Sequence, residues 1–427
     1  MTQLAHRIEP LPGLTYDVNR AGALRDLIAP PYDLIGPQLQ DELYSRSPYN
    51  VVRLELNREA DPYQDAARTL ERWMRAGVLK PTAPAIHLYT QTFQMGDRTM
   101  RRNALLVRIR LEEFSEGRIL PHERTFPKAK EDRLRLLGAT RVNVSPIFGL
   151  YPSAHDKVDA LIERALDRPA AIAVADDAAV DHQLRAIDAP GEVAFVQAEL
   201  ADARILIADG HHRYETALEY RRQMRAKENN PFQARPYDYV MMALVAFSDP
   251  GLVILPTHRI IRRLSAERLA LFKSYNATHF TVEEFDRADE MRARLTQLST
   301  GHFGAIVRGM RPRIMHLNNY STLQYALPYA PREVRELDVS ILHAMVFDRI
   351  FGIREEDVRK GMLIEYTIDA ASAQNEVETG KADAVFLLNP SKVEEIERVS
   401  RTLATMPEKS TYFYPKLVTG LLMNPIS

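Results

Sequence analysis

Two histidines and an arginine directly follow a glycine in the segment Asp209-Gly210-His211-His212-Arg213. The apolar run 203–208 before it predicts a short strand, and the residues from Arg213 to about 227 have the spacing of a helix. A glycine at such a turn lets the backbone approach a ligand closely. Free N–H groups at a helix start, together with cationic side chains, bind phosphate. The segment therefore predicts a phosphate site.

Two other interpretations of this segment stay open. In the first, His212 and Tyr214 only pack internally and Arg213 forms an ordinary salt bridge. In the second, the histidines bind a metal, but neighbouring residues on a helix point about 100° apart, so the i, i+4 pair of a zinc site is absent. The segment from His122 to Phe126 also lacks the second histidine of a zinc protease motif. Hydrolytic zinc chemistry is therefore disfavoured.

Further segments carry more polar functional side chains than packing requires. We expect them to bind substrate or phosphate, and their members are Tyr32, Asp33, Arg53, His122, Thr125, Lys128, Arg133, His258, Arg259, Lys409, Ser410, Thr411 and Lys416. Among them lies Glu123, a candidate general base or magnesium ligand. Each segment also has a plainer interpretation as a turn, a solvated face or an exposed loop. Residues 256–259 in particular are expected to form a loop after an apolar strand at 252–255.

The elements that must position these residues alternate without a regular strand–helix–strand rhythm. We expect helices at 62–76, 156–166, 265–275, 338–351 and 369–378, and strands at 85–93, 104–111 and 384–388. Asp338 is the expected N-cap of the fourth helix, and Ser391 with Glu394 the expected capping box of a further helix that runs to about Leu403. This mixture predicts an α+β protein with mixed sheets.

The length of 427 residues suggests more than one domain. We expect an N-terminal α+β region at 1–150 with possible substrate-site loops, a region at 151–263 that carries the Asp-Gly-His-His-Arg turn, and a C-terminal α+β region at 264–427.

The composition narrows the possible partners. Lys and Arg number 56 and Asp and Glu 57, so the net charge of −1 gives no general attraction to nucleic acid or anionic membranes. The chain has no cysteine, which excludes disulfides and thiolate chemistry. No apolar stretch is long enough for a membrane span, and the first residues lack the apolar core of a signal peptide. We therefore expect a cytoplasmic protein, without nucleic acid or membrane as partner.

Six blocks in order carry a resemblance over nearly the whole chain. They read APPYD at 29–33, NVVRL at 50–54, PHERT at 121–125, ADGHHRYETAL at 208–218, LPTHR at 255–259 and PEKSTYFYPKLVTGL at 407–421. These blocks resemble the signatures of the domain of unknown function 1015 family, which is bacterial and archaeal. The family name itself implies no activity.

The Asp-Gly-His-His-Arg turn is also similar to the phosphate-binding turn of the ParB and sulfiredoxin superfamily. Among its members, free serine kinases have the same turn. The resemblance implies a ParB/sulfiredoxin-like nucleotide-binding core, with Gly210, His211, His212 and Arg213 on the nucleotide phosphates and Asp209 beside them to position a hydroxyl or a metal. Sulfiredoxin chemistry needs a cysteine, which this chain lacks, and a basic helix-turn-helix for DNA is not found.

These resemblances imply a kinase-like phosphotransferase that uses ATP or ADP with Mg²⁺ and a small hydroxylated metabolite, with free serine as the favoured acceptor. The catalytic residues would be Glu123, Asp209 and His212, with Asp33 as the alternative base, and Mg²⁺ would take Glu123 or Asp209. Two alternatives stay open: a phosphatase acting on a phosphorylated metabolite such as phosphoserine, and a nucleotide-binding regulator without turnover. The oligomeric state is not predicted.

Overall fold

The computed structural model describes the chain except for residues 1–5, 124–126, 153–155, 229–232, 355–356 and 358–362. It divides into two compact units that are described separately. Unit 1 comprises Met1–Pro121, Thr125–Val253 and Pro415–Ser427, and unit 2 comprises His122–Arg124 and Ile254–Tyr414. Strands from the predicted regions 1–150 and 151–263 enter one sheet of unit 1. The division into three regions stays a prediction.

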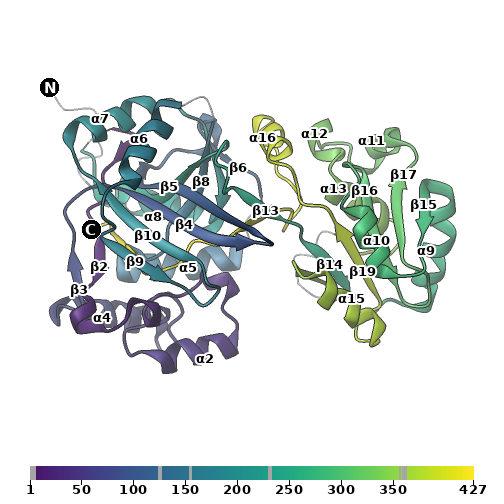
Figure 1. Cartoon of the computed structure of the whole chain (residues 1–427), viewed down its shortest axis with the longest axis horizontal. Coiled ribbons are helices and arrows are strands. Elements are labelled where there is room, and N and C mark those ends of the chain that lie inside the picture. The colour runs from purple at the N-terminus through teal and green to yellow at the C-terminus, as the bar shows by residue number, and fades with distance from the viewer. Residues whose placement is uncertain (1–5, 124–126, 153–155, 229–232, 355–356, 358–362) are drawn as a thin grey trace. The chain divides into compact units, whose positions relative to one another are not determined.

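Unit 1 is built on a nine-stranded mixed sheet (Figure 1). Its strands lie in the order β6-β11-β8-β12-β5-β4-β10-β9, with β1 beside β5. The pairs β11–β6 and β12–β8 are parallel and the other pairs antiparallel. The strands are β1 (Ile8–Glu9), β4 (Ile86–Met95), β5 (Arg98–Arg110), β6 (Ile119–Pro121), β8 (Ile147–Tyr151), β9 (Ile172–Ala175), β10 (Asp181–Ile187), β11 (Ile205–Asp209) and β12 (Tyr239–Ala246).

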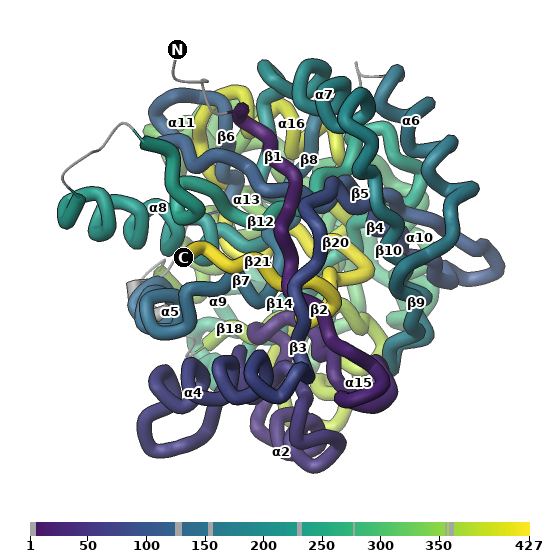
Figure 2. Tube along the Cα trace, turned by 90° about the vertical axis from the view of Figure 1, so that its left-hand side faces the viewer, coloured from purple at the N-terminus to yellow at the C-terminus, as the bar shows by residue number. Residues whose placement is uncertain are grey.

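Some helices of unit 1 lie at its two opposite ends. In both views α6 and α7 lie at the opposite end of the unit from α2 and α4 (Figures 1 and 2). A second apolar core, which includes Trp73 and Leu43, lies among the short N-terminal elements. The helices are α1 (Val18–Ala21), α2 (Pro37–Arg46), α3 (Val52–Glu55), α4 (Pro62–Arg75), α5 (Pro127–Thr140), α6 (Asp156–Leu166), α7 (Pro190–Glu199) and α8 (His211–Arg225); short strand pairs are β2 (Leu14–Tyr16) with β3 (Leu79–Pro81), and β7 (Val142–Asn143) with β21 (Asn424–Pro425).

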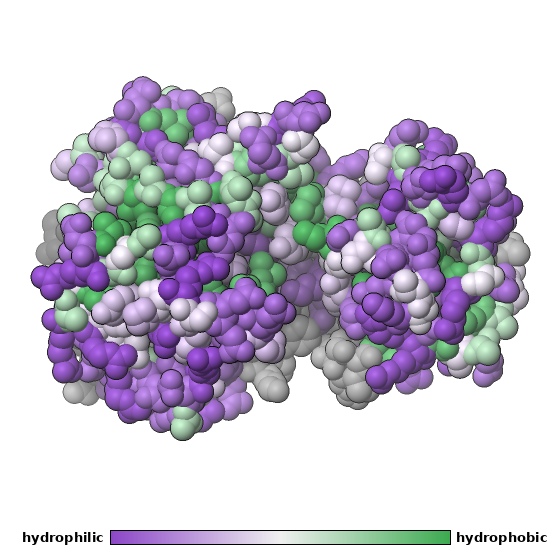
Figure 3. All heavy atoms as spheres, turned by 60° about the horizontal axis from the view of Figure 1, so that its bottom comes forward, coloured by the Kyte–Doolittle hydropathy of each residue, from purple (hydrophilic) through white to green (hydrophobic). Residues whose placement is uncertain are grey.

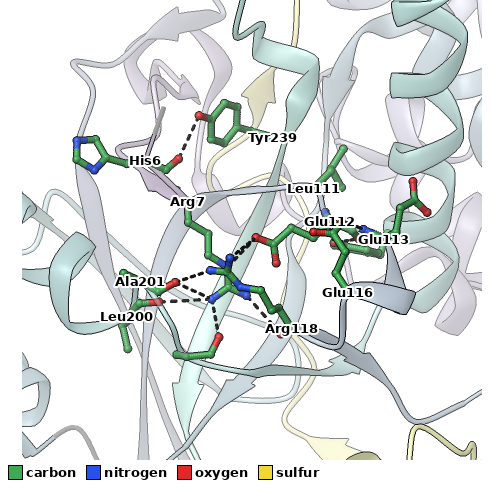
Figure 4. Close-up of polar contacts among 12 residues, drawn as sticks. His6, Arg7, Leu111, Glu112, Glu113, Glu116, Arg118, Leu200, Ala201 and Tyr239 are labelled. Atoms are coloured by element: carbon green, nitrogen blue, oxygen red, sulfur yellow. Dashed lines mark hydrogen bonds and ion pairs between the residues drawn. The ribbon is translucent and has the colours of Figure 1, made fainter. Parts of the chain in front are cut away.

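A buried ion pair ties the first strand of unit 1 to its surroundings (Figure 4). The guanidinium of Arg7 lies 3.1 Å from a carboxylate oxygen of Glu112, and both side chains are almost fully buried. Arg7 also donates hydrogen bonds to the carbonyl oxygens of Ala203 and Arg118. Because Arg118 directly precedes β6 and Ala203 lies just before β11, Arg7 holds the segments that precede these two paired strands.

Unit 2 has a six-stranded antiparallel sheet in the order β15-β17-β16-β19-β14-β18. Buried aromatic rings around Phe386 and apolar residues around Met291 pack against it. Its strands are β13 (Val253–Leu255, starting in unit 1), β14 (His258–Ile261), β15 (Phe280–Glu284), β16 (His302–Val307), β17 (Arg313–Leu317), β18 (Ile364–Thr367), β19 (Ala384–Leu388) and β20 (Tyr412–Tyr414); its helices are α9 (Ala266–His279), α10 (Ala288–Leu295), α11 (Leu323–Ala326), α12 (Arg332–Arg335), α13 (Asp338–Leu342), a π-helix (His343–Asp348), α15 (Ala370–Glu378) and α16 (Val393–Arg401).

The mixed α+β class and most predicted elements are confirmed, but three local predictions are wrong. Asp338 is the first residue of α13 and not its N-cap, because its carboxylate accepts a hydrogen bond from the N–H of Gly301. The N-cap of α16 is Lys392, because the Ser391 hydroxyl donates to the Ser410 carbonyl oxygen instead. Residues 258–259 lie in the buried strand β14 and not in a loop.

The visible face of each unit is mainly hydrophilic, with smaller apolar patches (Figure 3). Within the described parts of the chain, no helix combines the length and the apolar character that a membrane crossing requires.

Candidate functional site

The predicted phosphate turn joins β11 to α8 in unit 1. Gly210 has φ 93°, a left-handed conformation that side chains disfavour, and α8 begins directly after it at His211. A Cβ on Gly210 would lie only 3.0 Å from the Arg213 guanidinium. Glycine is therefore required here both by the backbone and by the space that Arg213 occupies. The helix begins two residues earlier than predicted, so both histidines lie in its first turn.

The first turn of α8 directs N–H groups away from the helix body. Tyr214 is the first residue whose N–H bonds back to the Gly210 carbonyl oxygen, at 3.0 Å. The N–H groups of the three preceding residues have no carbonyl partner within the helix. They add to the partial positive charge of the helix start. His211 is buried and His212 half-buried.

Arg213 is held rigidly beside the turn. It donates hydrogen bonds to the Ser145 hydroxyl at 3.1 Å and to the Pro146 carbonyl oxygen, and it lies 3.4 Å from an Asp209 carboxylate oxygen. Its Nε is buried and has no partner among the described residues. A fixed guanidinium with an unused donor is suited to receive an anion.

Lys416 comes from the C-terminal segment of unit 1 and lies beside the same turn. Its ammonium is 3.6 Å from the other Asp209 carboxylate oxygen, and both side chains are largely buried. Asp209 thus lies between Arg213 and Lys416. Arg213 and Lys416 are far apart in sequence, and both cations lie close to the Asp209 carboxylate at the end of β11.

Tyr32 and Arg133 form a second layer near Arg213. The Arg133 guanidinium lies 4.3 Å from the centre of the Tyr32 ring. Burial raises the pKa of Tyr32 to about 12, although the positive charges of Arg213 and Arg133 oppose this shift. The Tyr32 hydroxyl therefore stays protonated at neutral pH.

Glu55 completes this layer and is a residue that sequence reasoning missed. Its carboxylate accepts a hydrogen bond from Arg133 at 2.9 Å, and both side chains are buried. Glu55, Arg133, Ser145, Arg213 and Thr216 line one small cavity of about 50 Å³. The signal in the sequence was the position of Glu55 directly after the block at 50–54.

Two predicted residues of unit 1 are placed differently. Arg53 donates to the carbonyl oxygens of Tyr44 and Ser47 and stacks on the Tyr44 ring at 4.3 Å, so its contacts hold the local fold. Asp33 is exposed on a short 3₁₀ turn. Thr125 lies outside the described residues, as does the side chain of Lys128.

The other predicted residues belong to unit 2 and form a cluster of their own. The His122 ring nitrogen Nε2 is 2.9 Å from the Thr411 hydroxyl and 3.8 Å from a Glu123 carboxylate oxygen. The His122 carbonyl oxygen accepts from the Met406 N–H at 2.7 Å. The block at 121–125 and the block at 407–421 therefore meet at this point.

Arg259 bonds to the backbone of the same segment. It is fully buried and donates to the carbonyl oxygens of Thr257 and of Lys409, the latter at 3.0 Å. Burial lowers the pKa of Arg259 to about 10, while Tyr366 and Glu123 oppose this shift. Lys409 is exposed and has φ 52°, which Arg259 stabilises by bonding its carbonyl. The guanidinium thus fixes the backbone of this loop.

His258 and Ser410 also have structural partners. The Nδ1 of His258 accepts from the Leu388 N–H at 3.3 Å, and burial lowers the pKa of His258 to about 4. The Ser410 hydroxyl donates to the Pro407 carbonyl oxygen. Convergence of the unit 2 residues on the turn of unit 1 stays a prediction.

The described residues would hold a metal ion only together with oxygen ligands from a bound nucleotide. No group of three or more His, Asp or Glu suited to a metal occurs among the described residues. Asp209 carries two cationic neighbours, so a Mg²⁺ ion there would depend on further oxygen ligands such as nucleotide phosphates.

The fold and the turn define an α+β protein with a strand–glycine–helix turn between β11 and α8. The chain belongs to the family described as Protein of unknown function (DUF1015), whose model matches residues 8–340. No curated protein matches the sequence.

Several solved structures are similar to this chain at low identity. A conserved hypothetical protein from Pyrococcus furiosus is 12% identical, covering 74% of this chain and 92% of its own, with a TM-score of 0.37. Free serine kinase in complex with AMP is 12% identical, covering 73% and 86%, with a TM-score of 0.35. SbnI with C-terminal truncation from Staphylococcus aureus is 12% identical, covering 75% and 87%, with a TM-score of 0.36.

Proposed function

We propose that this protein is a nucleotide-dependent small-molecule phosphotransferase whose phosphate site is the turn at Gly210. The observation that carries the proposal is the convergence of Arg213 and Lys416 on Asp209 at the start of α8. Two cations and the N–H groups of a helix start give a site that neutralises phosphate charge. The resemblance of the turn to that of free serine kinases supports a nucleotide as the anion.

Phosphoryl transfer needs positioning and charge neutralisation more than covalent chemistry. The acceptor hydroxyl oxygen would attack the terminal phosphorus, the bond to the bridging oxygen would break, and the hydroxyl proton would pass to a carboxylate. Arg213, Lys416 and His212 would hold the phosphates. Glu123 is the proposed base and Asp33 the alternative. A Mg²⁺ ion bound with the nucleotide would neutralise further charge, with Asp209 or Glu123 as its protein ligand.

The acceptor is proposed to be a small hydroxylated metabolite, with free serine the first to test. Lys409 and Ser410 stand in the loop that Arg259 fixes, and they are proposed to contact this acceptor.

Titration of the protein with ATP, ADP and CTP, with and without Mg²⁺, tests the proposal. A nucleotide that binds the folded state raises the thermal midpoint. We expect Arg213→Ala to weaken nucleotide binding about 10- to 100-fold, since a hydrogen bond to a charged group contributes about 1.5–3 kcal/mol. Arg222→Ala, which removes an exposed cation from the other end of α8, is the matched control.

A second variant guards against misfolding of Arg213→Ala. Lys416→Met removes the second cation beside Asp209 and keeps a side chain of similar length, and it should also weaken nucleotide binding. Full nucleotide affinity in both variants would refute the site. Phosphate release from phosphoserine without nucleotide would indicate a phosphatase, and tight binding without any product would indicate a regulator.

A further inference from the structure

Unit 2 contains a pocket whose lining includes none of the predicted site residues. It has a volume of about 430 Å³ and lies where α11, α12, α13 and the π-helix meet the segment 405–408. Of these elements, α11 and α12 lie at the same end of the unit (Figure 1). The volume is within the range of small-molecule sites, about 300–1,000 Å³. Most of its lining is apolar, contributed by Ala326, Leu327, Ala330, Val334, Ala344, Ile353, Met406 and Pro407.

Two polar atoms in the wall of this pocket lack partners. Ser340 is 2% exposed, and neither its hydroxyl nor Nε2 of His343 has a hydrogen-bond partner among the described residues. A helical serine ordinarily bonds to the carbonyl four residues earlier or points to water. Leaving a buried polar group unpaired costs about 1–3 kcal/mol. Because Ser340 and His343 are three residues apart along one continuous helical segment, they share a face that lines the pocket.

The backbone at the pocket departs from a regular helix. Residues His343–Asp348 form a π-helix, and the N–H of Phe351 bonds to the carbonyl oxygen of Val346, five residues earlier. Such insertions are rare and are found mostly at functional sites. The π-helix directly follows α13, so it places Ala344 and Asp348 in the same wall as Ser340.

The charges around the pocket argue against an anionic ligand. Its charged lining residues are Asp348, Arg354 and Glu408, two acids against one base, and Asp348 and Arg354 are exposed. Burial, reinforced by the charge of Arg259, lowers the pKa of His343 to about 3, so its ring is neutral at physiological pH. The buried part of a ligand should therefore be uncharged, because a buried charge without a partner is costly.

We propose that this pocket binds an uncharged, mainly apolar heterocycle with one polar edge, which pairs with the Ser340 hydroxyl and with Nε2 of His343. The site is independent of the phosphate site at Gly210. Its ligand differs from a nucleotide phosphate in chemistry, since the described wall offers one base, Arg354, beside the two acids Asp348 and Glu408.

Ligand-observed NMR on the full chain tests the proposal with three probes. 2-Quinolinone presents an N–H and a carbonyl on one edge of an apolar ring system, 1-methyl-2-quinolinone lacks the N–H, and quinoline-2-carboxylate carries a charge. We expect 2-quinolinone to bind at millimolar concentration or below, its methylated analogue to bind several-fold more weakly, and the carboxylate not to bind. Absence of 2-quinolinone binding to the folded protein would overturn the proposal.

Variants locate the binding in the pocket. Ala330→Trp adds a large side chain to the lining and should abolish binding, whereas Ala293→Trp, at an exposed position of α10 outside the lining, should not. Binding that survives Ala330→Trp would place the ligand elsewhere and refute the site.

Ser340→Ala separates a ligand contact from a structural role. Removing an unpaired hydroxyl should leave the thermal midpoint unchanged or raise it, while 2-quinolinone affinity falls about 3- to 10-fold. A lowered midpoint with unchanged affinity would show that the hydroxyl serves the fold, and the proposal would fail. This variant also remains informative if Ala330→Trp does not fold.

Discussion

Arg133 and Glu55 form a buried ion pair that connects α5 to α3 beside the proposed phosphate site. Both side chains are at most 7% exposed, and Arg133 also bonds to the Glu55 carbonyl oxygen. Breaking a buried pair by removing one partner leaves an uncompensated charge and costs about 3–5 kcal/mol. We therefore expect Arg133→Met to lower the free energy of unfolding by about this amount in urea titrations followed by Trp73 fluorescence.

A neighbouring arginine provides the control for this prediction. Arg135 lies on the same helix, is exposed, and stacks on the Tyr63 ring at 4.9 Å. Arg135→Met should change stability by at most about 0.5 kcal/mol. If Glu55→Leu combined with Arg133→Met does not recover part of the loss, the cost does not come from an unpaired Glu55.

At the scale of elements, the start of α13 carries a carboxyl group that is unfavourably buried. Burial raises the pKa of Asp338 to about 7, Glu395 raises it further, and the Gly301 N–H and Lys392 oppose the shift. Between pH 4 and pH 7 the unfolded chain releases this proton while the folded chain keeps it. The folded state therefore binds more protons, and this group lowers the free energy of unfolding as pH rises through that window.

Asp338→Asn removes this dependence and preserves an oxygen acceptor for the Gly301 N–H. We expect the variant to gain stability relative to the unmodified protein by about 1–3 kcal/mol at pH 8, and to gain little at pH 4. Urea unfolding followed by circular dichroism at the two pH values measures the difference. An equal effect at both pH values would mean that the carboxyl group is not protonated in the folded protein.

The helices and strands show which local features the sequence could predict and which it could not. Helix α4, the strands β4 and β5, and helix α15 were predicted from local periodicity, and all of them are present. The caps at Asp338 and Ser391 were wrong because each polar group bonds to a distant residue, Gly301 and Ser410 respectively. Local spacing carries no information about such partners.

Some residues of the candidate site could likewise be predicted from the sequence, and others could not. The turn at Gly210 was predicted because its glycine, histidines and arginine are consecutive. Glu55 was missed because its partner Arg133 is 78 residues away, and its one signal in the sequence is that it directly follows the block at 50–54. The sequence did not predict that Arg259 lies in a strand, because arginine is ordinarily a surface residue. Here its side chain is buried and donates hydrogen bonds to the carbonyl oxygens of Thr257 and Lys409.

For the whole molecule, each unit has its own sheet and its own apolar core. The chain contains one tryptophan, Trp73, which is buried in the second core of unit 1. Tryptophan fluorescence therefore reports on unit 1, while circular dichroism reports on both units. We infer that the two units unfold in separate transitions, since each of these apolar clusters lies within one unit.

Phe386→Ala tests this inference from unit 2. Phe386 is fully buried and contacts the rings of Phe272, Phe303, Phe347 and Phe351, so its truncation should cost about 3–5 kcal/mol. We expect one part of the circular dichroism transition to move to lower denaturant while the Trp73 transition stays in place. Leu105→Ala in the sheet of unit 1 should do the reverse and move the Trp73 transition. If Phe386→Ala moves both signals together, the two units unfold as one cooperative body, and ligand-induced shifts at the Gly210 turn would then report on the stability of the entire chain.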